Sequence, residues 1–229
     1  MIVNRPGAFV LMASLVAMAS PLQAAAPRQL LAEAAFVARD KAVALGQIAE
    51  AERVAAAVLA REPGNREAAF ARAMALGYKA KLARHRGEAL EARRLFEALA
   101  ADDPRDAEAA AAVGTWHLDS VIDLGGLVAG MAIGAKKAIG FAMTDRAVAL
   151  GGNRATYAGL AALLRLAIDP DDPRGRSLAE RAAAAATPQP LDRVFQRSAV
   201  AILASLKGGN DKATQKLARQ LLPFGRLDR

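Results

Sequence analysis

The sequence predicts an all-α protein, and three observations support this fold class. Alanine supplies 59 of the 229 residues, whereas Val, Ile and Thr together supply 25. This ratio favours helix, because β-branched side chains lose rotamer freedom there and Ala has none to lose. Apolar residues also recur at helical spacing between short Gly-, Pro- and Asp-containing breaks. Finally, no run alternates apolar and polar residues as a half-buried strand does.

Composition and length exclude several classes of protein. The chain has no Cys, which excludes disulfides, thiolate metal sites, a Cys nucleophile and a lipidated Cys. Its hydrophobic content of 54% and charged content of 24% exclude an intrinsically disordered chain. The length allows one domain or one repeat array with an ample core.

Residues 1–26 have the pattern of a secretory signal peptide. Arg5 supplies the positive end, Ala8–Ala19 is apolar, and small residues follow Pro21, so we expect cleavage after Ala24. A retained membrane anchor is the alternative, but the apolar run is shorter than the ~20 residues that a spanning helix needs. We therefore predict a protein exported to the periplasm, without a transmembrane segment in the mature chain.

From Gln29 onward, helical patterns follow one another with short breaks, which predicts about ten helices of ~12–20 residues. Short connections place neighbouring helices antiparallel. The breaks are Gly46, Glu62–Asn65, Arg86–Gly87, Asp102–Arg105, Gly151–Asn153, Asp169–Pro173, Thr187–Pro190 and Gly208–Asn210.

Two of these segments align with each other, which indicates an internal repeat. The positions Ala51, Ala55, Val58 and Pro63 correspond in spacing to Ala92, Phe96, Leu99 and Pro104. This spacing resembles the second helix of the tetratricopeptide repeat, and the first-helix pattern is echoed by Ala110, Val113, Gly114 and His117. The resemblance implies antiparallel helix hairpins stacked into a right-handed superhelix with a concave groove. The repeats here are longer and more degenerate than that family's ~34 residues.

The expected organisation is a signal peptide at 1–26, a repeat array at 27–190 and a C-terminal cap at 191–229. The repeats fall at about 32–65, 66–106, 107–153 and 154–190. The cap is basic, with eight Lys or Arg against three Asp or Glu. Two closing helices are expected there, with an apolar side made of Phe195, Leu203, Leu206, Leu217 and Leu221.

The segment Gly114–Gly152 is the least repeat-like part of the chain. It holds the only Trp and an uncharged run from Leu124 to Ala135, in which Gly recurs every fourth residue at 126, 130 and 134. On a helix these glycines form a stripe that lets another backbone come close; alternatively, Gly125 and Gly126 break the chain and a flexible apolar loop follows. We expect an inserted helix or loop packed into the concave side, with a partner or lipid contact as the alternative.

Catalytic and metal-binding patterns are weak. His117, Asp119, Ser120 and Asp123 lie within two helical turns, without a nucleophile turn or an oxyanion hole, and Asp119 does not face His117 on a helix. The two histidines, His85 and His117, fall in different repeats and match no metal-ligand spacing. Phosphate-binding loops and dinucleotide-binding fingerprints are absent from the sequence. We therefore predict no enzymatic activity, no cofactor and no metal.

Basic residues gather near one expected helix end, at Lys79, Lys81, Arg84, His85 and Arg86. Positive charge there complements the helix dipole, which is the preferred interpretation. As binding residues, they would suit an anionic lipid or membrane surface or an acidic protein better than nucleic acid, since interleaved aromatics are missing.

These observations predict an exported adaptor or scaffold that binds another protein, in envelope assembly or transport. Two alternatives remain: a binder of lipid or another small apolar molecule, and an accessory subunit of a transporter or exporter. The candidate partner-binding residues are Arg72, Tyr78, Lys79, Trp116, His117, Asp119, Lys136, Lys137, Tyr157 and Arg165.

Overall fold

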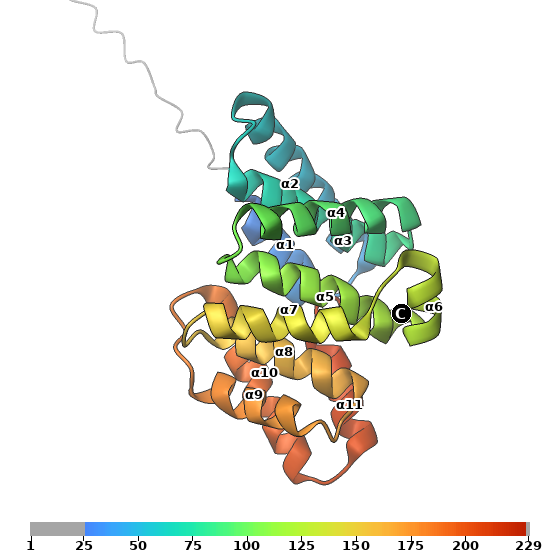
Figure 1. Cartoon of the computed structure of the whole chain (residues 1–229), viewed down its shortest axis with the longest axis vertical. Coiled ribbons are helices and arrows are strands. Elements are labelled where there is room, and N and C mark those ends of the chain that lie inside the picture. The colour runs from blue at the N-terminus through green and yellow to red at the C-terminus, as the bar shows by residue number, and fades with distance from the viewer. Residues whose placement is uncertain (1–25, 228–229) are drawn as a thin grey trace, which may run out of the picture.

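The computed structural model describes residues 26–227, and this part of the chain forms eleven α-helices and no strand (Figure 1). The prediction of an all-α protein is therefore confirmed. The helices are α1 (Pro27–Phe36), α2 (Lys41–Arg61), α3 (Arg66–Ala83), α4 (Arg86–Asp102), α5 (Ala107–Leu124), α6 (Gly126–Ile133), α7 (Lys137–Leu150), α8 (Ala155–Ile168), α9 (Pro173–Ala184), α10 (Pro190–Lys207) and α11 (Asp211–Leu221).

Polar side chains in the breaks between helices start many of these helices. Five N-cap side chains accept backbone N–H groups of the first turn, which satisfies donors that have no partner inside the helix. They are Asp40, Asn65, Asp106, Asp172 and Asn210. The break predicted at Gly46 is wrong: α2 runs through this residue, which faces solvent with open space around it. A single exposed Gly costs a helix only about 1 kcal/mol, which a 21-residue helix tolerates.

Consecutive helices pack against each other along the chain, except for α6 and α7. The helix α5 packs most extensively on α7, and α6 lies beside their junction as an insertion. The helix α8 is the centre of the second half, because α5, α7, α9, α10 and α11 all contact it. Eleven of its 14 residues are buried, so its apolar sequence on all sides is that of a core helix.

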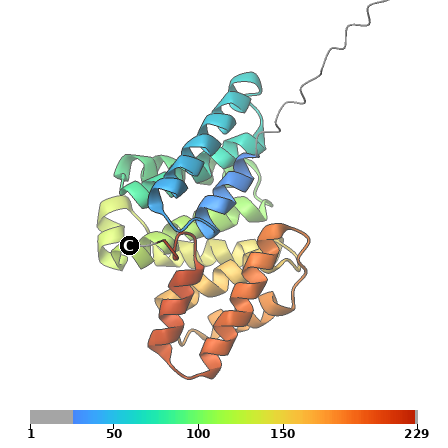
Figure 2. The ribbon, with the colours of Figure 1, turned by 180° about the vertical axis from the view of Figure 1, so that it is seen from behind.

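The C-terminal segment returns to the beginning of the described chain (Figure 2). The backbone N–H of Phe224 donates to the Ala35 carbonyl at 2.8 Å, and the Phe224 ring meets Tyr78 edge-on at 4.8 Å between centroids. Phe36 at the end of α1 stacks edge-on against Phe195 of α10 at 5.6 Å. The C-terminal segment thus forms two helices, α10 and α11, and it also packs against α1.

The predicted signal peptide lies outside the described residues, apart from Ala26 directly before α1. Among residues 26–227, no single helix is both long enough and apolar enough to cross a bilayer. Only α6 and α7 taken together meet those criteria, and they are bent by 92° relative to each other.

Candidate functional site

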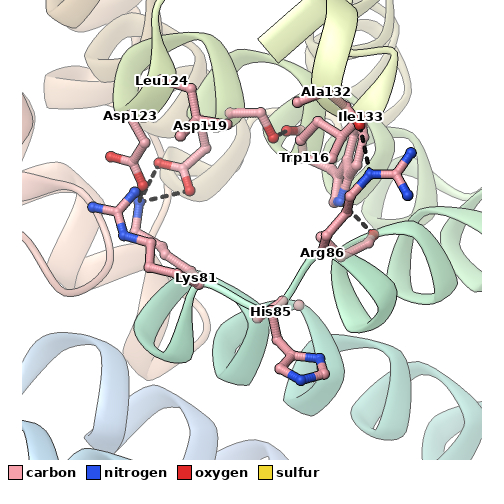
Figure 3. Close-up of a pocket in the computed structure, with 14 residues that line it drawn as sticks. Lys81, His85, Arg86, Trp116, Asp119, Asp123, Leu124, Ala132 and Ile133 are labelled. Atoms are coloured by element: carbon pink, nitrogen blue, oxygen red, sulfur yellow. Dashed lines mark hydrogen bonds and ion pairs between the residues drawn. The ribbon is translucent and has the colours of Figure 1, made fainter. Parts of the chain in front are cut away.

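A pocket of about 220 Å³ opens between two helix pairs. The end of α3, the turn at Arg84 and His85 and the start of α4 form one side, and α5 and α6 form the other (Figure 3). Its lining is mostly apolar, with Trp116 and Leu124 from α5 and Ile133 from α6. The long helices α3 and α5 therefore set the depth of the pocket, and the inserted helix α6 supplies one wall.

Trp116 is held in one orientation at this pocket. Its indole N–H donates to the Ala89 carbonyl of α4 at 2.9 Å, which satisfies the only polar atom of a buried ring. The guanidinium of Arg93 lies 5.3 Å from the centre of the ring. The pocket thus presents a rigid aromatic surface that does not need ordering when a partner binds.

One rim of the pocket carries an ion cluster that joins α3 to α5. Lys81 Nζ lies 2.7 Å from both carboxylate oxygens of Asp119 and 3.0 Å from Asp123 Oδ2. The side chains of Lys81 and Asp119 are only 19% and 21% exposed. Burial alone would lower the pKa of Lys81, but the two carboxylates outweigh it and the pKa is raised. Burial also raises the pKa of Asp119, and Lys81 offsets this only in part.

The opposite rim is built from arginines of α4 that hold the end of α6. Arg86 Nε donates to the Ala132 carbonyl at 2.8 Å, as Figure 3 shows, and an Arg93 guanidinium N–H donates to the Gly134 carbonyl at 3.4 Å. Cations suit these positions, because carbonyls at the C-terminal end of a helix have no partner inside it. His85 points away from the cavity in the same view.

His117 lies directly behind Trp116 and is completely buried. Its Nδ1 accepts the backbone N–H of Lys136 at 3.2 Å, and Nε2 has no partner among the described residues. Burial, together with the nearby charge of Arg93, lowers the pKa of His117 to about 4. The ring is therefore neutral at pH 7, and it fixes the start of α7 rather than facing solvent.

The apolar run Leu124–Ala135 does not form the single twelve-residue helix that its spacing allowed. Gly125 breaks it with a φ of 79°, and Gly134 ends α6 with a φ of 70°, a left-handed conformation that favours glycine. No backbone of another helix approaches the glycine stripe. A Cβ at Gly126 would meet no atom within 4 Å, one at Gly130 only the Ala135 carbonyl oxygen, and one at Gly134 only the Arg93 guanidinium at 3.1 Å. The prediction of a close backbone contact there is wrong.

The close helix contact lies elsewhere in the same segment. A Cβ on Gly114 would come within 2.9 Å of the Gly140 carbonyl oxygen, and one on Gly140 within 2.5 Å of the Leu118 side chain. Gly114 and Gly140 thus bring α5 and α7 together at a distance that no side chain permits. This contact keeps the two helices paired across the inserted α6.

The outer face of α6 is exposed and apolar. Leu127, Val128 and Met131 are 76%, 50% and 74% exposed, whereas Ala129 and Ile133 on the opposite side are buried. Lys136 and Lys137 follow immediately and are exposed. The expectation that this insert packs into the concave side is therefore wrong for three of its largest residues.

The predicted partner-binding residues divide into two groups. Trp116, His117, Asp119, Lys136 and Lys137 come together around the pocket and α6. The other five lie outside this region: Arg72, Tyr78, Lys79, Tyr157 and Arg165.

Most of this second group makes internal contacts. Burial raises the pKa of Tyr78, which packs on the C-terminal segment, and Lys79 pairs with Glu88 at 2.7 Å. Tyr157 packs against the backbone at Gly151 and under Arg154. Arg165 is 7% exposed and is held by Asp145 and Asp172 at 2.9 and 3.1 Å. Arg72 is exposed.

Sequence reasoning named Asp123 only in a weak catalytic pattern and Lys81 only in a basic cluster, and it did not predict that the two form an ion cluster. It did not single out the three exposed residues of α6 either. A signal for the ion cluster was present, because Asp119 and Asp123 are four residues apart and share a helix face. The exposure of Leu127 and Met131 had no such signal, since apolar residues in an uncharged run are usually core.

The side chains considered for catalysis do not form a nucleophile–base pair. The Ser120 hydroxyl donates to the Trp116 carbonyl at 2.7 Å, and Asp119 and Asp123 engage Lys81. Among residues 26–227, no group of three or more His, Asp or Glu side chains is arranged to hold a metal ion. What the region offers chemically is a rigid apolar pocket with charges of both signs at its rim.

Comparison of the chain with protein-family models, with curated proteins and with solved structures finds no match in any of the three. The resemblance to tetratricopeptide repeats therefore stays a prediction from the sequence pattern.

Proposed function

We propose that this chain is a non-catalytic helical adaptor that binds a protein partner. The pocket between α3/α4 and α5/α6 receives one anchoring side chain of that partner. The single observation that carries the proposal is the preformed pocket itself, with Trp116 fixed in its wall and the Lys81–Asp119–Asp123 cluster at its rim. A few buried anchors in such pockets dominate the energy of many protein interfaces.

The size of the pocket favours a protein side chain over a free small molecule. Small-molecule sites usually enclose about 300–1,000 Å³, and this pocket encloses about 220 Å³. The alternative of a lipid or another apolar ligand held between the helices is therefore disfavoured.

The packing supports, as part of this proposal, a tetratricopeptide-like array built from the pairs α1/α2, α3/α4, α5/α7 and α8/α9. In this array the pocket lies between the second and third pairs. We further propose that residues 1–26 direct export to the periplasm, where the adaptor acts in envelope assembly or transport. A role as accessory subunit of a transporter or exporter is one form of that function.

The test fills the pocket from a residue that lines it. Ala132→Trp places a large ring into the cavity from α6, and Ala56→Trp puts the same residue on the exposed face of α2 as a matched control. We expect crosslinking and purification from the host periplasm to recover a protein with the wild type and Ala56→Trp, and to lose it with Ala132→Trp. Identical recovery from both variants would refute the pocket as the binding site.

Export is tested separately by cell fractionation and N-terminal sequencing. We expect a soluble periplasmic protein that starts near Ala25. A membrane-bound protein that still carries Met1 would overturn this part of the proposal.

A further inference from the structure

Exposed apolar side chains are concentrated on one projecting element of the molecule. The described residues include nine large apolar side chains with high exposure, and five of them fall between Leu124 and Ile139. The three on α6, Leu127, Val128 and Met131, follow one another at helical spacing on its outer face. A contiguous apolar surface on a folded protein usually marks a contact site.

The helix that carries this surface is firmly held on its inner side. Ala129 and Ile133 are buried, and the last turn closes with N–H groups of Gly134 and Ala135 donating to the Gly130 and Ala129 carbonyls. Arg86 and Arg93 of α4 also donate to the end of the helix. The apolar side chains are therefore displayed on an ordered support.

The surroundings of α6 are positively charged. Lys136 and Lys137 are exposed directly beyond its end, and within residues 26–227 neither has an ion-pair partner; Arg86 at its base has none either. Asp119 and Asp123 pair with Lys81, and Glu97, on the same helix as Arg86, pairs with Arg93. No acidic residue occurs from Leu124 to Thr144.

We propose that the outer face of α6 inserts into the surface of a bilayer that contains anionic phospholipid, with Lys136 and Lys137 binding the headgroups. A short apolar helix face beside basic residues suits the boundary between acyl chains and headgroups, where apolar burial and attraction to anionic lipid act together. Eight residues rise about 12 Å, so α6 enters one leaflet only. Because the charge around this projecting helix is positive, we favour an anionic membrane surface over an apolar groove on another protein.

This inference uses a different face from the pocket and stands or falls independently of the proposed protein partner. The residues Leu127, Val128 and Met131 do not line the pocket, and Ala132 does. We therefore expect Ala132→Trp to retain membrane binding. The variant Leu127→Ser/Met131→Ser should conversely retain the protein partner.

The test is flotation of the full chain, purified as its host produces it, with phosphatidylcholine vesicles with and without phosphatidylglycerol. We expect binding only to the anionic vesicles and release by high salt. Leu127→Ser/Met131→Ser and Lys136→Glu/Lys137→Glu should each lower the partition coefficient at least about tenfold. The control Val43→Ser/Val200→Ser changes two side chains that are 54% and 56% exposed elsewhere, and it should bind like the wild type.

A second readout locates the insertion directly. Because the chain has no Cys, Met131→Cys and Val200→Cys each take one environment-sensitive fluorophore. We expect a blue shift on anionic vesicles at position 131 and none at 200. Absence of vesicle binding, or equal binding by the wild type and the α6 variant, would overturn the proposal. A wild-type dimer in analytical sedimentation, replaced by a monomer in Leu127→Ser/Met131→Ser, would also overturn the proposal, because the outer face of α6 would then bind a second copy of the chain.

Discussion

The helix pairs α3/α4 and α5/α7 lie side by side but are connected in different ways. The helices α3 and α4 are connected by only two residues, and the first of these, Arg84, adopts a left-handed conformation with a φ of 59°. The helices α5 and α7 are joined by residues 125–136, which include the whole of α6. The pocket lies between the tight turn of the first pair and the inserted helix of the second.

This difference shows where a helical pair can accept an insertion without separating. The α5/α7 contact rests on Gly114 in the middle of α5 and Gly140 in the first turn of α7, and it is closer than that of α3/α4. In the first pair a Cβ on Gly77 would lie 3.6 Å from Ala92, an ordinary contact. The closer packing of α5 on α7 leaves their connection available for α6.

The sharpest test of this comparison is to add one methyl group to each pair. In Gly114→Ala the new Cβ would lie 2.8 Å from the Thr144 nitrogen and 2.9 Å from the Gly140 carbonyl oxygen, which are backbone atoms. We expect a loss of about 3 kcal/mol in the free energy of unfolding, because the helices must move apart. Gly77→Ala should instead stabilise by about 0.5–1 kcal/mol through helix propensity.

Urea denaturation of both variants measures these changes. Equal effects in the two pairs would show that α5 and α7 are no more tightly packed than α3 and α4.

The two histidines provide the next test, since one belongs to each pair. Burial lowers the folded-state pKa of His117 to about 4, from an ordinary value of 6.5. The unfolded chain therefore binds more protons between these values, and the stability present above pH 6.5 is lost as the pH falls toward 4. The loss amounts to about 3 kcal/mol.

The measurement is the free energy of unfolding against pH for wild type, His117→Gln and His85→Gln. We expect the difference between wild type and His117→Gln to shrink by about 3 kcal/mol from pH 7 to pH 4. His85→Gln is the matched control, because it changes an exposed histidine of the other pair. Parallel curves for all three proteins would mean that His117 is not a source of acid sensitivity.

The sequence predicted the helices well because the information for them is local. Asn65, Asp106 and Asn210 are capping residues directly after Pro- or Gly-containing turns, and alanine fills the helices between them. Trp116 and His117 were named as candidates because they lie in the segment Gly114–Gly152, the least repeat-like part of the chain. These features depend on residues a few positions apart.

What the sequence did not predict depends on segments that are distant along the chain. The glycines at 126, 130 and 134 follow a contact motif, yet the helices meet at Gly114 and Gly140 because those residues face each other in the fold. Tyr78 was expected to line an open groove, but the returning C-terminal segment places Phe224 against it. Neither contact can be predicted from the sequence of a single helix.

The ion cluster that connects the two pairs allows a third, smaller test. Asp119→Asn removes one of the two carboxylates that hold Lys81, and we expect a loss of about 1–2 kcal/mol, because Asp123 still satisfies part of the ammonium. Glu50→Gln is the matched control, since Glu50 pairs with Arg53 on the surface of α2. It should cost much less than Asp119→Asn, because an exposed ion pair contributes little to stability.

Chemical denaturation at low and high salt checks this prediction. Screening should weaken the contribution of the exposed Glu50 pair more than that of the largely buried Asp119 pair. A loss for Asp119→Asn no larger than for Glu50→Gln would show that the cluster does not hold α3 to α5.

The smallest expected effect concerns the bond that ties α6 to the first pair. Arg86→Gln removes the hydrogen bond from Arg86 Nε to the Ala132 carbonyl. Arg84→Gln is the control, because the side chain of this arginine in the same turn has no hydrogen bond or ion pair among the described residues. We expect Arg86→Gln to leave global stability within about 0.5 kcal/mol of the wild type. Amide exchange at Ala129 and Ile133 should nevertheless rise about three- to tenfold, since local opening of α6 does not require global unfolding. Unchanged exchange in Arg86→Gln would mean that the burial of Ala129 and Ile133 alone holds α6 in place. Faster exchange in both Arg86→Gln and Arg84→Gln would mean that the loss of positive charge, rather than of the hydrogen bond, loosens α6.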